Sequence, residues 1–249
     1  MLIHRTEDPQ WLANAYVVAA AAGGPAIWID GQGAHDELHA FVEQNGLTVE
    51  RILLTHHHID HLEGVEEVRA RYRVEVCASA RATELIEGAV TVDRILGNTE
   101  TFQAGGLEIR CLPTPGHADG HLSFLCDGTD VLTGDALFRG TVGGTRGPGH
   151  TTLTDLRRSV MEVLLGLPDE TRVHPGHTLP TTIGEERTTN PFVLYWRGEM
   201  IALDEPVVAW GNPATLLVWG PDYDGGHKAL VRWADGSEDI VGGSRVERG

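Results

Sequence analysis

Short apolar runs bounded by glycine, proline or aspartate recur along the first 140 residues, and each is typical of a buried or half-buried strand. The clearest begins at Gly106, where Leu107, Ile109 and Cys111 alternate with polar positions. Two later runs, 121–126 and 131–135, are joined by a segment containing Asp-Gly, which favours a hairpin. The other strands predicted in this part are residues 15–20, 26–30 and 51–55.

Three segments instead show the three- and four-residue spacing of an apolar helix face. The first ends near Gly46, a typical C-terminal cap, and the third begins at Thr152 with Asp155 three residues on, as in a capping box. Alternation of strands and helices favours α/β layers. The apolar faces are Leu38, Phe41 and Val42; Val65, Val68 and Tyr72; and Leu156, Val160, Val163, Leu164 and Leu167.

The pattern changes near residue 203, after which strand-like runs alternate with turns and helical spacing disappears. We therefore predict a main domain, residues 1–202, and a small all-β module, residues 203–249, for which an SH3-like barrel is one candidate form. Because a tryptophan buries a large area, we interpret Trp210, Trp219 and Trp233 as core residues of this module rather than as the lining of a ligand groove.

Composition excludes several classes of function. The 249 residues carry a formal net charge of −17, which repels nucleic acid and anionic membrane surfaces. The three cysteines are widely spaced and predict neither a disulfide framework nor a thiolate metal site, so we expect a reducing cytoplasm. The N-terminus has mixed charge, unlike a signal peptide, and no apolar run is long enough to span a membrane.

Residues 53–64, LLTHHHIDHLEG, place four histidines and an aspartate in six consecutive positions between a predicted strand and a predicted helix. His56 and His58 are two apart, so in an extended segment their rings project to the same side, as two ligands of one metal must. Asp60 and His61 follow as the chain turns and point elsewhere, which suggests two adjacent ions. A histidine run alone is often only a solvated turn, so the metal hypothesis requires further ligands downstream.

Three candidates follow predicted strands, and each lies beside a glycine: His117 in TPGHADG, Asp135 in LTGDALF and His177 in VHPGHT. Side chains at strand ends have rigid backbone support, which a metal site needs. We expect His57 to point away from the site. His121, His150 and His174 are interpreted as hydrogen-bonded framework residues.

In this order, T-H-x-H-x-D-H, PGH, GDALF and PGHT resemble the metallo-β-lactamase superfamily, and GDALFRG with TTIGEERTTNPF is most similar to its short hydrolases related to glyoxalase II. The resemblance covers about residues 10–200. It implies an αββα sandwich, two sheets back to back with helices outside and the site at one edge. It also implies one metal held by His56, His58 and His117, a second held by Asp60, His61 and His177, and Asp135 as the bridge between them.

Imidazole and carboxylate ligands without thiolate suit Zn²⁺, Fe²⁺ or Mn²⁺, and zinc is our first expectation for the two ions. Metal lowers the pKa of bound water from 15.7 to about 7, so the resulting hydroxide is the expected nucleophile, oriented by Asp60 as the catalytic carboxylate. The expected substrate is a small thioester, such as a hydroxyacyl-thiol conjugate, or a related ester.

Three alternatives stay open. A mononuclear non-haem iron dioxygenase acting on a thiol persulfide would need only positions of the His56, His58 and His117 type with the aspartate. A lactonase or other esterase would use the same attacking hydroxide. In the third, non-enzymatic case, the β module would bind a partner or form a homodimer.

The sequence departs from its relatives after Asp135. They usually carry GxxGRTD, whereas this chain reads GTVGGTRGPGH, with Gly144 in place of the familiar arginine and Arg146 where an acid is common. Arg139 is therefore our candidate for binding a substrate carboxylate. Glyoxalase II also has a helical C-terminal domain that binds glutathione. This chain has a β-rich module in its place, so we do not expect glutathione specificity.

Overall fold

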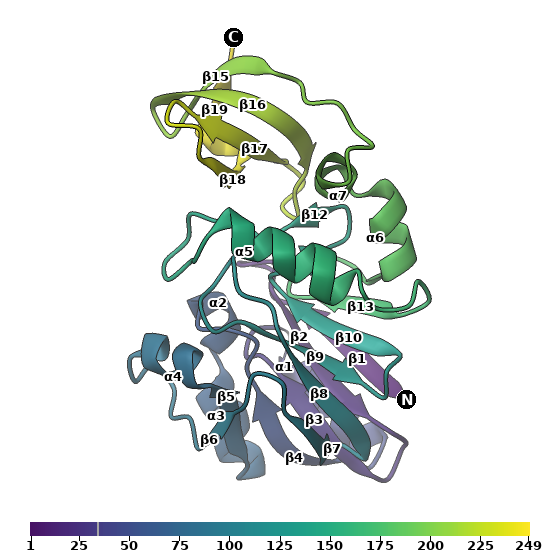
Figure 1. Ribbon diagram of the computed structural model, residues 1–249. Coiled ribbons are helices and arrows are strands. Elements are labelled where there is room, and N and C mark those ends of the chain that lie inside the picture. Colours follow the sequence, from purple (N-terminus) through teal and green to yellow (C-terminus); the bar gives the residue numbers. More distant parts are fainter. Residues whose placement is uncertain (34) are drawn as a thin grey trace.

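The computed structural model describes residues 1–33 and 35–249. These residues form two six-stranded sheets packed face to face with helices on the outside, followed by a smaller antiparallel sheet at the C-terminal end (Figure 1). The expected αββα sandwich with a small all-β addition is thereby confirmed. Every helix in the described ranges is too short or too polar to cross a bilayer.

The first sheet has the order β1-β2-β3-β4-β5-β6, antiparallel up to β3 and parallel from there on. Sequence analysis missed β1, whose apolar pattern is interrupted by charged residues, and it also missed β5 and β6. Its strands are β1 (Leu2–Glu7), β2 (Asn14–Ala19), β3 (Pro25–Ile29), β4 (Thr48–Leu53), β5 (Glu75–Ser79) and β6 (Arg94–Leu96).

The second sheet has the order β14-β13-β10-β9-β8-β7, and only the β13–β10 pair is parallel. The predicted hairpin is confirmed by the pairing of β9 with β10, with Asp127 and Gly128 at positive φ in its turn. Its strands are β7 (Thr101–Ala104), β8 (Leu107–Pro113), β9 (Leu122–Cys126), β10 (Asp130–Gly134), β13 (Arg172–Pro175) and β14 (Thr181–Thr182), and a separate ribbon joins β11 (Leu137–Phe138) to β12 (Thr141–Val142).

Alternate residues of a strand face opposite sides, so the first sheet contributes to two apolar cores, one between the two sheets and one beneath the outer helices. On β3, Ile27 and Ile29 face the second sheet, while Trp28 faces the helices that cover the outside. The predicted inward residues of β8 and all three cysteines are buried, and the cysteines are free. The helices are α1 (His35–Gln44), α2 (Ile59–Leu62), α3 (Val65–Tyr72), α4 (Ala80–Ile86), α5 (Leu153–Arg158), α6 (Ile183–Thr189) and α7 (Pro191–Trp196).

The helix predicted from Thr152 is capped as expected, because the Thr152 side chain accepts a hydrogen bond from the backbone N–H of Asp155. It does not remain α-helical. Residues Ser159–Leu164 form a π-helical turn in which Leu165 N–H bonds to the carbonyl of Val160, five residues back. Apolar spacing did not predict this change.

The C-terminal sheet has the order β18-β17-β16-β15-β19 and is antiparallel throughout. Trp219 and Trp233 pack against its core as predicted, whereas Trp210 is 47% exposed, so its assignment to the core was wrong. The barrel form and the boundary at residue 202 stay predictions. The elements are β15 (Glu205–Ala209), β16 (Asn212–Pro221), β17 (His227–Trp233), β18 (Glu238–Gly242), the 3₁₀ turn η2 (Gly243–Arg245) and β19 (Val246–Arg248).

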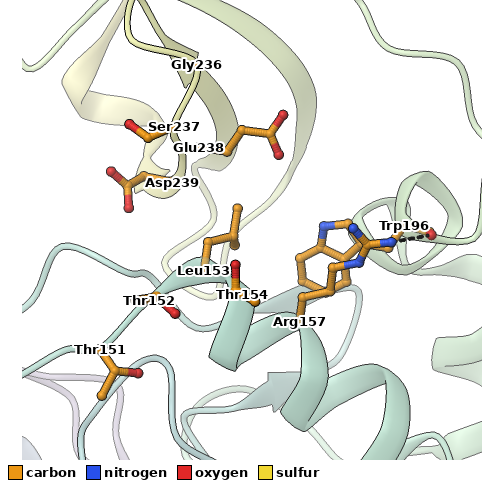
Figure 2. Close-up of a pocket in the computed structure, with 10 residues that line it drawn as sticks. All are labelled: Thr151, Thr152, Leu153, Thr154, Arg157, Trp196, Gly236, Ser237, Glu238 and Asp239. Atoms are coloured by element: carbon orange, nitrogen blue, oxygen red, sulfur yellow. Dashed lines mark hydrogen bonds between the residues drawn. The ribbon is translucent and has the colours of Figure 1, made fainter.

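This C-terminal sheet packs on α5 and α7 and shares an apolar cluster with the second sheet of the sandwich. Beside the contact lies a cleft of about 450 Å³, between the first turn of α5 and the β17–β18 turn, with Arg157 and Trp196 along one wall (Figure 2). Arg157 donates a hydrogen bond to the carbonyl of Trp196 over 3.2 Å, so one N–H group of its guanidinium already has a partner.

Candidate metal centre

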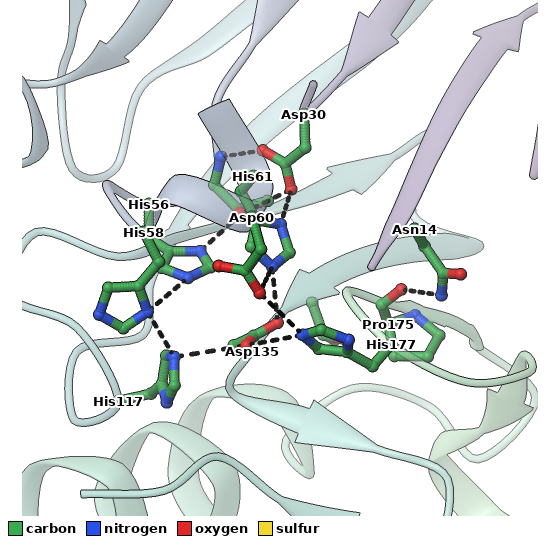
Figure 3. Close-up of polar contacts among 12 residues, drawn as sticks. Asn14, Asp30, His56, His58, Asp60, His61, His117, Asp135, Pro175 and His177 are labelled. Atoms are coloured by element: carbon green, nitrogen blue, oxygen red, sulfur yellow. Dashed lines mark hydrogen bonds and ion pairs between the residues drawn. The ribbon is translucent and has the colours of Figure 1, made fainter. Parts of the chain in front are cut away.

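The first group of predicted ligands meets where β4 runs into α2. His56 Nε2 lies 3.1 Å from His58 Nδ1, and the same His58 atom lies 2.9 Å from Nε2 of His117, which follows β8 (Figure 3). These three nitrogens converge within 4.8 Å. The structure thus brings together residues that lie 59 positions apart in the chain.

The second group is formed by α2 and the segment after β13. Asp60 Oδ2 lies 3.4 Å from His177 Nε2 and 3.8 Å from His61 Nε2 (Figure 3). His61 and His177 are buried, while the Asp60 side chain keeps 19% of its surface exposed. Asp60 is therefore the carboxylate of this group that a substrate or water molecule can reach.

Asp135 lies between the two groups. Its Oδ2 is 3.3 Å from both His117 Nε2 and His177 Nε2, and its Oδ1 is 3.3 Å from His61 Nε2. One carboxylate therefore touches a member of each group, which is the arrangement that a bridging ligand requires.

The other ring nitrogen of each histidine has an oxygen partner, which decides which nitrogen faces the centre. Thr55 Oγ1 donates to Asp30 and so accepts from His56 Nδ1. The other four oxygen partners are Pro148 O for His58 Nε2, Asp30 Oδ2 for His61 Nδ1, Gly144 O for His117 Nδ1 and Leu12 O for His177 Nδ1.

These donor atoms fit metal ions. In their neutral forms, the five imidazoles present unprotonated nitrogens to one space, and lone pairs 2.9 to 3.1 Å apart repel one another unless a cation lies among them. The buried atoms His61 Nε2 and Asp135 Oδ1 also lack any hydrogen-bond partner within residues 1–33 and 35–249. Buried polar atoms without partners are costly, so an ion bound here would remove a penalty.

The two groups differ in charge. Burial and the neighbouring His61 lower the pKa of His56, and burial lowers that of His117 to about 3, so both rings are neutral at pH 7. Burial also acts to lower the pKa of His177, but Asp135 and Asp60 outweigh it and raise that pKa to about 9. Burial acts to lower the pKa of His61 as well, but Asp135 and Asp30 outweigh it and raise that pKa, so in the metal-free protein both rings of the second group hold a proton.

Sequence analysis missed Asp30, which ends the run AIWID at the C-terminal end of β3. Its Oδ1 accepts from the N–H of Thr55 and its Oδ2 from His61, so it orients both the histidine turn and a predicted ligand. An acid that closes an otherwise apolar strand was the available signal.

His121 is a framework residue, as predicted. Its Nε2 accepts from the N–H of Asp135 at 3.1 Å and its Nδ1 bonds to Thr114 Oγ1 at 2.8 Å, so it holds Asp135, the predicted bridge, by its backbone. His174 bonds to Asp130 at 2.9 Å, and His150 bonds to the carbonyl of Gly147. All three therefore have partners outside the two ligand groups.

His57 points away from the ligand groups, toward the carbonyl of Pro148, and is buried. Arg139 ion-pairs with Glu185 over 3.5 Å and is half exposed, so its role toward a substrate carboxylate stays a prediction. Arg146 reaches the C-terminal sheet instead, 3.5 Å from Asp239 and over the ring of Trp233.

Comparison with known proteins agrees with this geometry. Residues 8–177 match the model of the metallo-β-lactamase superfamily. An uncharacterised protein of Mycobacterium leprae is 35% identical over 72% of this chain and 93% of its own length. A hydroxyacylglutathione hydrolase of Halorhodospira halophila is 33% identical over 73% of this chain and 82% of its own.

Solved structures show the same fold. ETHE1 from Myxococcus xanthus is 31% identical, with a TM-score of 0.67 over 78% of this chain and 84% of its own. The protein TTHA1623, solved in a di-iron-bound form, is 34% identical, with a TM-score of 0.64 over 75% of this chain and 98% of its own. By sequence match, fold and the order of its motifs, the chain belongs to the metallo-β-lactamase superfamily.

Proposed function

We propose that this protein is a hydrolase that uses two divalent metal ions, with zinc as the first expectation, to cleave a small thioester of the hydroxyacyl-thiol type. The observation that carries the proposal is the convergence of two ligand groups on Asp135. His56, His58 and His117 would hold one ion, Asp60, His61 and His177 the other. Bound ions of this kind activate water near neutral pH and polarise a carbonyl.

Asp60 is the catalytic residue in this proposal. Burial acts to raise its pKa, but the hydrogen bond to His177 and the charge of His61 outweigh burial and lower it, so Asp60 is ionised. As the part-exposed carboxylate of the second group, it can accept a hydrogen bond from the attacking water and hold that water toward the carbonyl.

Thioester chemistry suits this set of residues. A thiol has a pKa of about 8.5, so a thiolate leaves without prior protonation. An amine leaving group would require a general acid, whereas the histidines of both groups would be bound to the ions as neutral ligands and could not donate a proton. The Halorhodospira relative is a hydroxyacylglutathione hydrolase, which supports the acyl class, and the di-iron form of TTHA1623 supports two ions.

Metal content per chain, measured beside turnover, tests the proposal. We expect two ions per chain and hydrolysis of a 2-hydroxyacyl thioester, with simple esters and lactones assayed in parallel. One iron per chain with oxygen uptake on a persulfide would instead assign the protein to the dioxygenases and overturn the proposal.

A pair of histidine variants provides a matched control. His177→Ala removes a proposed ligand, whereas His174→Ala removes a buried histidine of the same segment that bonds to Asp130. We expect His177→Ala to lose one ion and about a hundredfold or more in turnover, since even the partners of metal ligands contribute 10- to 100-fold. His174→Ala should keep both ions.

A further inference from the structure

The turn between β16 and β17, residues 222–226, reaches from the C-terminal sheet to the candidate metal centre. In it, the Tyr223 ring stacks face to face on the imidazole of His177, with centroids 4.0 Å apart and planes 14° from parallel. Phe138 meets both rings edge-on, at 5.6 Å from His177 and 5.9 Å from Tyr223. Tyr223 therefore covers a proposed metal ligand.

Lys228 holds this turn in place. The residue is 4% exposed, and its ammonium donates to the carbonyl of Val142 at 2.9 Å and pairs with Asp222 at 3.0 Å. It also lies 5.1 Å from the ring centroid of Phe138 and 5.2 Å from that of Tyr223. A buried charge is stable only with such partners, and these come from both the sandwich and the C-terminal sheet.

The hydroxyl of Tyr223 is available to a ligand. Within residues 1–33 and 35–249 it forms no hydrogen bond, although the side chain is half-buried. By contrast, the backbone N–H of Tyr223 bonds to Asp222, and Lys228 bonds to the carbonyl of Val142. A tyrosine hydroxyl usually finds a hydrogen-bond partner where it becomes buried, as it would under a bound substrate. Because its ring stacks on His177, Tyr223 borders the second ligand group, and the acyl part of a substrate would bind next to that group.

We propose that Tyr223 is a specificity-determining residue, whose hydroxyl donates a hydrogen bond to the 2-hydroxyl oxygen of a hydroxyacyl substrate. The inference rests on the proposed hydrolase function and extends it. The acyl group would be selected by a residue of the C-terminal sheet, beyond residue 177, where the match to the superfamily model ends.

The test removes the hydroxyl from either side of this hydrogen bond. Tyr223→Phe keeps the stacked ring, and the substrates are a 2-hydroxyacyl thioester and the same thioester without the hydroxyl. We expect Tyr223→Phe to lower kcat/KM for the hydroxyacyl substrate about tenfold and to leave the other substrate unchanged. The matched control is Tyr195→Phe, which removes a tyrosine hydroxyl from another element, α7.

Binding of the product acids provides a readout that does not depend on turnover. By calorimetry, the wild-type protein should prefer the 2-hydroxy acid over the deoxy acid, and Tyr223→Phe should lose that preference while keeping its metal content and Tm. An unchanged preference in Tyr223→Phe overturns the inference. Absence of thioester turnover in the wild type, with the acid preference intact, would overturn the proposed function and leave Tyr223 as a ligand-binding residue.

Discussion

Asp30 and His61 form a buried pair: Nδ1 of His61 donates to Oδ2 of Asp30 over 2.9 Å, although the residues lie 31 positions apart. The bond leaves Nε2 of His61 facing the centre, and the other Asp30 oxygen accepts from the N–H of Thr55. One carboxylate thus orients a proposed ligand and the start of the histidine turn.

Replacing Asp30 with asparagine should weaken metal binding. The amide provides only one acceptor, so it cannot serve both Thr55 and His61, and loss of such a partner typically lowers metal affinity 10- to 100-fold. Titration against a competing chelator measures the change. Asp130→Asn is the control, because Asp130 is also buried but pairs with His174 and Arg172; it should lose stability and keep wild-type metal affinity.

Gly176 leaves no room for a side chain beside the centre. A Cβ atom there would lie 2.1 Å from Asp135 Oδ1 and 2.8 Å from His61 Cε1. Gly176→Ala should therefore displace the proposed bridge, bind at most one ion tightly and lose turnover. Gly144→Ala is the matched control, since its Cβ would meet Ile240 O at an ordinary 3.6 Å. Two ions bound by Gly176→Ala with unchanged affinity would contradict this reading of the site.

Sequence analysis predicted the candidate ligands because each lies at the end of a local pattern. His117, Asp135 and His177 follow apolar strand runs and adjoin glycines, so their placement at one sheet edge followed from strand geometry. The acid that closes the run AIWID marked Asp30 as unusual, but its partner lies 31 positions away, and a short pattern does not record such a contact.

The C-terminal turn was missed for a related reason. Sequence analysis treated residues 222–226 only as one of the turns that alternate with strand-like runs, because the position of Tyr223 over His177 depends on how the whole sheet packs against the sandwich. Likewise, residue type and apolar spacing alone did not predict the exposure of Trp210 or the π-helical turn after α5.

Metal affinity should rise with pH. In the metal-free protein, Asp135 and Asp60 raise the pKa of His177 to about 9 against the effect of burial, and this proton must leave before the ring can bind an ion. A raised pKa stabilises the metal-free fold below the unfolded pKa of about 6.5, and this contribution is lost as pH rises toward 9.

The Tm difference between metal-loaded and metal-free protein should therefore widen from pH 6.5 to pH 9. Affinity should increase about tenfold per pH unit for each proton released. Thermal unfolding with and without chelator, together with proton release on metal addition, checks both statements. A difference that stays constant with pH would mean that His177 binds no ion or holds no proton.

Loss of the C-terminal sheet should unfold the rest of the chain. Leu217, Val218, Leu230 and Ile240 are buried in the same apolar cluster as Val142, Leu153 and Trp196 of the sandwich and its helices. Deleting residues 203–249 would expose that cluster, so we expect residues 1–202 alone to aggregate or to lose cooperative unfolding.

A milder variant tests the same contact within the full chain. Leu230→Ala, a large-to-small change at a fully buried position, should lower the free energy of unfolding by about 2–5 kcal/mol. Val208→Ala replaces a residue of β15 that is 37% exposed, and it should change the free energy of unfolding by less than about 0.5 kcal/mol. The sandwich and the C-terminal sheet should melt in one calorimetric transition, because the apolar cluster that contains Leu230 belongs to both of them. Two separate transitions, of which Leu230→Ala shifts only that of the C-terminal sheet, would show that each part folds alone.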